Sequence, residues 1–95
     1  MSGAPGTVPD AAEARLKKLR MRSWRRGTKE MDLILGPFAD RNLAALDPDV
    51  LDRFAQLLNE NDQDLYRWVT GAEPAPAPFG SLIARIACEA GVPGA

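Results

Sequence analysis

The segment Arg26-Gly27-Thr28-Lys29-Glu30 combines three kinds of recognition chemistry within five residues. Arg26 supplies a planar fork of donors that pairs with carboxylates, and Glu30 supplies an acceptor. Gly27 has no Cβ, so its backbone can turn sharply and let another chain approach closely. These residue types favour a protein-recognition corner between two helices. A simpler interpretation is a plain helix end at Arg26-Gly27, with Glu30 in the first turn of the next helix.

The charge of the chain changes sign at this segment. Residues 1–29 hold eight of the twelve Lys and Arg residues against two acids, whereas residues 30–95 hold four against eleven. The net charge of −1 therefore conceals a basic N-terminal part. The residues flanking the corner are candidates for the edge of a partner-binding surface, where cations would steer an acidic partner. The cations are Arg22, Arg25 and Lys29, and Trp24 beside them is a further candidate for partner contact.

The basic cluster has two other interpretations. Lys and Arg on one helix could contact the phosphates of a nucleic acid, or they could form an ordinary solvated face. We expect no nucleic-acid partner, because the whole chain is slightly acidic and no recognition helix follows a tight turn. Trp24, Tyr66 and Trp68 could form a stacking platform, but Trp68 is in phase with apolar neighbours and is expected in the core. Trp24 is equally compatible with a core edge and a contact surface.

The residues needed for several kinds of catalytic or metal site are missing. The sequence has no His and one cysteine, Cys88, so His-containing zinc sites, His general bases and Ser-His triads are excluded within this chain. The acids are expected to cap helices or to face solvent. We therefore expect a protein that is not an enzyme, with no catalytic or metal-binding residues. Cys88 is expected to be a small residue at the edge of the core.

Apolar residues recur at helical spacing throughout the chain, which predicts an all-α fold, a small single-domain bundle of five helices. Residues 1–9 are expected to be a disordered arm, residues 10–91 the helical domain and residues 92–95 a tail. The first helix is capped by Asp10, and Gly36-Pro37 should kink or break the second. The segment 73–78 should be an extended strap. The predicted helices are 10–26, 28–46, 47–58, 62–70 and 81–90.

The sequence also suggests where the protein works. Residues 1–9 have neither a basic start nor an apolar stretch, so no targeting signal is visible and a cytoplasmic location is expected. The longest nearly apolar run, 33–39, is too short to span a bilayer, so no membrane partner is expected. We expect a monomer. An exposed Leu33 opposite the core stripe would leave room for self-association.

The corner and its surroundings resemble a known family. Arg26-Gly27-Thr28-Lys29-Glu30 fits the R-G-x-x-E signature of the SdhE-type flavoprotein assembly factors. The similarity covers roughly residues 15–90, and only the proline-rich strap and the short tail depart from the family. The other matching blocks, in the same order and spacing, are Trp24-Arg25, Met31-Asp32-Leu33-Ile34-Leu35, Pro37-Phe38 and Asp62-x-Asp64-Leu65-x-x-Trp68 followed by Gly71.

The resemblance implies an assembly factor or chaperone. Such factors bind the flavoprotein subunit of succinate dehydrogenase and promote covalent attachment of FAD to it; fumarate reductase is a second candidate client. The chemistry then belongs to client and flavin, and FAD is not bound stably here, where no G-x-G-x-x-G loop occurs. The alternative function is a small helical nucleic-acid-binding or regulatory module that uses the basic first helix. A helical partner of another oxidoreductase is a third possibility.

Matched residue by residue, the functional set implied by the resemblance is Arg26, Gly27 and Glu30. Our hypothesis gives each a role. Gly27 lets the corner approach the client backbone, and the donor fork of Arg26 binds a client carboxylate or carbonyl. Glu30 either takes a client donor or fixes Arg26.

Overall fold

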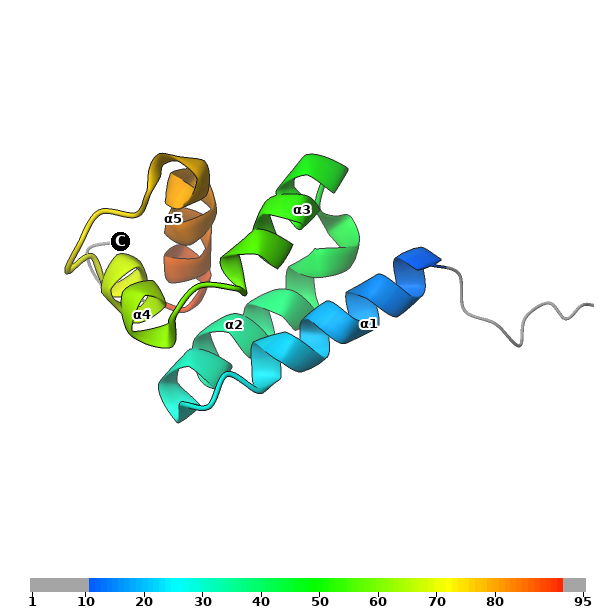
Figure 1. Ribbon diagram of the computed structural model, residues 1–95, viewed down its shortest axis with the longest axis horizontal. Coiled ribbons are helices and arrows are strands. Elements are labelled where there is room, and N and C mark those ends of the chain that lie inside the picture. Colours follow the sequence, from blue (N-terminus) through cyan, green and yellow to red (C-terminus); the bar gives the residue numbers. More distant parts are fainter. Residues whose placement is uncertain (1–10, 92–95) are drawn as a thin grey trace, which may run out of the picture.

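The computed structural model describes residues 11–91, and within them the fold is entirely helical. In Figure 1, α1 and α2 lie side by side, joined by a tight turn, while α4 and α5 pack together at the far end from the start of α1. The all-α, five-helix prediction is confirmed for this part of the chain. The elements are α1 (Ala11–Trp24), α2 (Lys29–Asn42), η2 (Leu43–Ala45), α3 (Pro48–Leu57), α4 (Asp62–Thr70), η3 (Ala77–Phe79) and α5 (Gly80–Glu89).

Helix α2 is the central helix of the core. It buries Met31, Leu35, Phe38 and Ala39, more apolar side chains than α1, α3 or α4 contributes. The rings of Phe38 and Phe54 stack with centroids 5.8 Å apart, which joins α2 to α3. Stacked aromatic pairs add to the stabilisation from burial alone. Because α2 contacts α1, α4 and α5, its position fixes where the preceding turn lies.

Helix α1 ends at Trp24, two residues before the predicted end. The backbone N–H of Arg25 donates to the carbonyl of Arg22, and the N–H of Arg26 donates to Oδ1 of Asp32 at 2.6 Å. The N–H of Arg26 is therefore used to fix the turn and cannot continue the helix. The predicted Asp10 cap, the N-terminal arm and the C-terminal tail lie outside the described residues.

Helix α2 runs unbroken through Pro37, so the predicted interruption is not a break. Proline has no N–H to donate to the carbonyl of Leu33. Leu33 is 55% exposed, as expected, so this carbonyl lies on the side of the helix that water can reach. The neighbouring Gly36 has a separate role, because it is buried beneath Trp24 of α1.

The ring of Trp24 lies directly on the backbone of Gly36. A Cβ built on Gly36 would be 2.3 Å from Cδ2 of Trp24, closer than any real contact. The indole Nε1–H donates to Oδ2 of Asp40 at 3.2 Å, while the side chain stays 39% exposed. Trp24 is thus a core-edge residue that locks α1 against α2, and glycine is the residue that leaves room for it.

The C-terminal half differs from the sequence predictions in two places. The strap is not extended throughout, because residues 77–79 form the 3-10 turn η3 and bury Phe79 against Trp68, with ring centroids 6.1 Å apart. Cys88 is exposed, so its placement at the core edge is wrong. Helix α5 fills its buried face with Leu82, Ile83, Ile86 and Ala87, which turns Cys88 outward.

Several helix ends agree with the sequence predictions more closely. Gly71 has φ 82° and ends α4, as predicted. The cap of α4 is Asn61, whose Oδ1 accepts the N–H of Gln63 at 2.7 Å, and α5 spans residues 80–89 in place of 81–90. Asp47 is at the cap position of α3, but its side chain makes no capping hydrogen bond.

We predict that Gly36→Ala lowers the free energy of unfolding by about 1–3 kcal/mol, because the new methyl group must displace Trp24. The measurement is urea unfolding followed by circular dichroism. The control is Gly80→Ala, which places its Cβ in open space at the start of a helix and should be neutral or slightly stabilising. Equal effects of the two substitutions would contradict the assigned contact.

Candidate functional site

The turn between α1 and α2 is held from both sides and exposes Gly27 at its centre. Thr28 caps α2, its Oγ1 accepting the N–H of Met31 at 3.3 Å, and Asp32 holds the N–H of Arg26. Gly27 has φ 102°, a backbone conformation that residues with a Cβ rarely adopt. A Cβ there would meet no atom within 4 Å. The turn therefore needs glycine for its backbone conformation, and the space in front of it is open.

The guanidinium of Arg26 binds three acceptors of its own chain. Nε donates to Oδ1 of Asp62 at 2.7 Å, Nη2 donates to the carbonyl of Glu60 at 2.7 Å, and Nη1 donates to the carbonyl of Leu58. The Arg26 side chain is only 10% exposed. Leu58 and Glu60 follow the last turn of α3, where carbonyls lack helical partners and carry partial negative charge. The donor fork of Arg26 thus binds the end of α3, the loop that follows and the start of α4. A contact of Arg26 with a client stays a prediction.

Two further arginines on the same side of α1 also face α3. Arg15 pairs with Asp52 at 2.8 Å, and Nη2 of Arg22 donates to Oδ1 of Asn59 at 2.8 Å. Arg15 and Arg22 are seven residues apart, so they lie on one side of α1, and Arg26 in the turn that follows binds the same region of the fold. Arg22, predicted to belong to the steering edge, therefore has one of its donors committed to holding α1 on the loop after α3.

The remaining predicted site residues are exposed. Gly27, Arg25, Lys29 and Glu30 are exposed around the turn, and Trp24 is turned towards α2. The Glu30 side chain has no hydrogen bond or ion pair with any described residue, so it does not fix Arg26. The turn thus separates the predicted set into an internal member, Arg26, and an exposed group.

Glu30 lines an open groove of about 400 Å³ between the start of α2 and α4. Tyr66 is 45% exposed and lies in the same groove. Asp62, 36 residues from Arg26, borders the groove and holds Arg26 behind it. Nothing local in the sequence joins these helices, so their meeting was not predicted. The lining residues are Thr28, Glu30, Met31, Asp62, Gln63, Tyr66 and Arg67.

The groove and turn are suited to contact with another macromolecule. Glu30 offers an unused carboxylate, the phenol of Tyr66 can donate or accept, and Gly27 allows close approach of a backbone. Among the described residues, no group of three or more His, Cys, Asp or Glu side chains could hold a metal ion. None of the helices within residues 11–91 has the length and apolarity needed to cross a membrane.

We predict that Arg26→Ala destabilises the fold by about 2–4 kcal/mol, because two carbonyls and the carboxylate of Asp62 lose a mostly buried partner. Arg25→Ala is the matched control. The Arg25 side chain is exposed and has no partner among the described residues, so its loss should change stability by no more than about 0.5 kcal/mol. Thermal unfolding of both variants tests the prediction, and a stable Arg26→Ala protein would refute it.

Comparison with known proteins finds related sequences among succinate dehydrogenase assembly factors. A protein of Mycosarcoma maydis named succinate dehydrogenase assembly factor 2, mitochondrial, is 40% identical over 73 residues, which cover 77% of this chain and 31% of the relative. The succinate dehydrogenase assembly factor 2-A, mitochondrial, of Drosophila yakuba is 34% identical over 76 residues, covering 78% and 47%. The chain thus spans about half or less of the length of these relatives. Their names include the word mitochondrial, and the cytoplasmic location expected for this chain stays a prediction.

The family comparison covers the turn, the groove and all but the first turns of α1. The family described as flavinator of succinate dehydrogenase matches residues 17–89, which is most of the chain. Every residue of the predicted partner-binding set lies within this match. The chain therefore belongs to the family of succinate dehydrogenase flavinators.

Proposed function

We propose that this protein is an assembly factor that binds the flavoprotein subunit of succinate dehydrogenase and promotes covalent attachment of FAD to it. Family membership supports the reaction and the client. The observation that carries the mode of binding is the turn itself, which exposes Gly27 and the unused carboxylate of Glu30 while Arg26 is held inside. The fumarate reductase flavoprotein, whose chemistry is related, is a further candidate client.

The proposed mechanism is positioning of the client. The turn is stiff, because both its backbone and the Arg26 side chain are bound within the chain. Gly27 lets the client backbone come close, and Glu30 accepts a donor from the client at the mouth of the groove. A rigid docking surface loses little conformational entropy on binding, so more of the interaction energy can hold client domains in the reactive arrangement.

The bond to the flavin is formed by groups of the client and of FAD. FAD is the client's cofactor and is not held stably by this chain. The factor acts by orientation, which can contribute several kcal/mol to a reaction whose groups are otherwise poorly aligned. It is not an enzyme in its own right on this proposal.

The nucleic-acid alternative gains no support from the arrangement of basic residues. Three arginines of the N-terminal cluster bind groups of the chain itself, so fewer cations are free to contact phosphates than the sequence suggested. The expected monomeric state stays a prediction.

We predict that the protein raises the yield of covalent flavin when mixed with apo-flavoprotein subunit and FAD, and that Gly27→Arg abolishes the effect. The arginine would fill the open space in front of the turn, where the client backbone approaches. The measurement is flavin fluorescence that stays with the polypeptide after denaturation.

Gly27→Ala is the control for backbone strain. It shares the unfavourable φ of 102° but adds only a methyl group, so it should lose about 1–2 kcal/mol of stability and retain most of the flavinylation. Circular dichroism must show both variants helical. No rise in covalent flavin with the unchanged protein would overturn the proposed function, and an unfolded Gly27→Arg protein would make Gly27 structural.

We predict that Glu30→Gln weakens binding to the apo-flavoprotein subunit about tenfold, because a charge-assisted hydrogen bond becomes a neutral one. Asp49→Asn is the control, since Asp49 is also exposed in the first turn of a helix but lies on α3. Titration calorimetry at one salt concentration compares the two. Equal affinities would exclude Glu30 from the contact.

A further inference from the structure

The basic residues of the N-terminal cluster divide into two groups with different surroundings. Arg15, Arg22 and Arg26 face α3 and its following loop, where each has a partner. The side chains of the other five form no hydrogen bond or ion pair with any described residue. This second group, which we call the free cations, consists of Lys17, Lys18, Arg20, Arg25 and Lys29.

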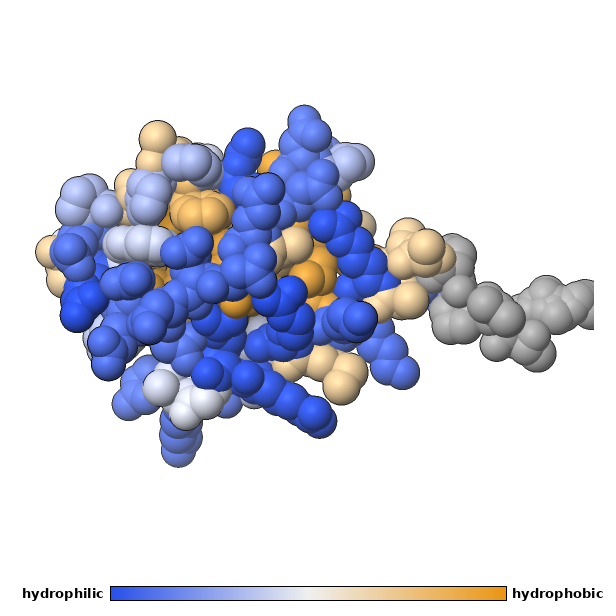
Figure 2. Space-filling model, in the orientation of Figure 1, coloured by the Kyte–Doolittle hydropathy of each residue, from blue (hydrophilic) through white to orange (hydrophobic). Residues whose placement is uncertain are grey.

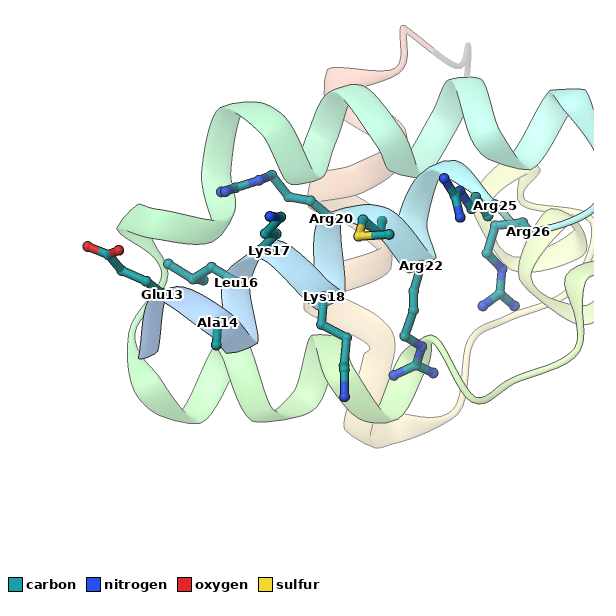
Figure 3. Close-up of a pocket in the computed structure, with 10 residues that line it drawn as sticks. Glu13, Ala14, Leu16, Lys17, Lys18, Arg20, Arg22, Arg25 and Arg26 are labelled. Atoms are coloured by element: carbon teal, nitrogen blue, oxygen red, sulfur yellow. The ribbon is translucent and has the colours of Figure 1, made fainter. Parts of the chain in front are cut away.

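Four of the free cations border an open groove along the outer face of α1. The groove measures about 830 Å³. Figure 3 shows Arg20 reaching towards α2 and Lys18 reaching towards α3, on either side of the helix. Long basic side chains therefore form most of the groove's walls, and one acidic residue, Glu13, borders it near the start of α1.

The floor of this groove is apolar. Ala14 and Met21 are seven residues apart, so they lie on one line of the helix, and both border the groove. Met21 is 45% exposed although it is a large apolar side chain. Figure 2 shows a mostly hydrophilic surface in which hydrophobic side chains appear only in patches. An apolar line between cations is better covered by an amphipathic acidic segment than left exposed to water, because such a segment buries the apolar side chains and pairs with the cations.

We propose that the outer face of α1 binds an acidic, amphipathic segment of the same flavoprotein client. This inference rests on the proposed function. The groove adjoins the exposed turn through Arg25, so one client surface can cover both. The unpaired like charges repel one another in the free protein, and an acidic partner relieves that repulsion.

The composition of the groove favours a protein segment over a nucleic acid. None of its lining residues is aromatic, so the groove offers no ring on which a base could stack. The phosphate backbone of a duplex has no apolar group to cover Met21. An acidic helix or loop supplies both carboxylates for the walls and apolar side chains for the floor.

The test compares the binding of the Lys17→Gln/Lys18→Gln variant and of the unchanged chain to the apo-flavoprotein subunit. Both lysines are exposed, so the fold should not change. We expect affinity to fall about tenfold at low salt and the remaining binding to depend less on salt, because screening acts on exposed charges over about 8–10 Å. Gln56→Glu/Ser81→Glu changes the net charge equally at exposed positions on α3 and α5, and should alter affinity less than twofold.

The outcomes separate this inference from the proposed function. If the unchanged protein binds the flavoprotein and both double variants bind equally well, the role of the α1 groove is wrong and the proposed function stands. If the unchanged protein does not bind, both fail. When the assembly factor is added at a concentration that saturates the flavoprotein, the Lys17→Gln/Lys18→Gln variant should restore full flavinylation, whereas the Gly27→Arg variant should not. Tighter binding to a 20-nucleotide single-stranded RNA than to the flavoprotein would overturn the inference in favour of a nucleic acid.

Discussion

The hydrogen bonds of the Arg26 guanidinium are the constraint on which the candidate site depends. They join the turn after α1 to the end of α3 and the start of α4 through Leu58, Glu60 and Asp62. Leaving such acceptors without a donor in a mostly buried place costs far more than the net value of each bond. The same side chain therefore fixes the position of Gly27 relative to α4. The arginine of the R-G-x-x-E pattern acts here as an internal support for its glycine and glutamate.

A second constraint fixes the other side of the turn. Trp24 covers Gly36 and donates to Asp40, so the end of α1 cannot slide along α2. Trp24, the last residue of α1, contacts α2, whereas Arg26 in the turn that follows binds the end of α3 and the start of α4. Together they hold the turn between two rigid supports. A surface held in this way suits a protein whose proposed task is to position another protein.

The N-terminal basic cluster has two physical functions in this fold. The three partnered residues are all arginines, whose planar donor fork suits directional bonds to carboxylates and carbonyls. Both lysines of α1, Lys17 and Lys18, belong to the free cations. A lysine carries a strongly hydrated charge on a flexible side chain, so these two charges can remain in water. Net charge alone does not separate the two groups. Their separation explains how a strongly basic helix can be part of the core and still offer a charged outer face.

The sequence by itself determined the helices and most of their limits, because the signals are local. Apolar spacing defined α3, α4 and α5, and residues such as Thr28 and Gly71 act on backbone groups within a few residues of themselves. The exposed part of the site, Gly27 and Glu30, could also be named from the local pattern. These features require no knowledge of which helices meet.

Only the tertiary structure decided which distant residues meet. The partners of the Arg26 guanidinium lie 32 to 36 residues away, and the sequence offered no reason to choose them over a group of another protein. Trp24 finds Gly36 across a helix interface, and Cys88 points outward because its neighbours fill the buried face of α5. Helical periodicity fixes the direction in which a side chain points around the axis of its helix. The element that it faces depends on how the helices pack, and that packing turned Arg26 inward and left Glu30 at the surface.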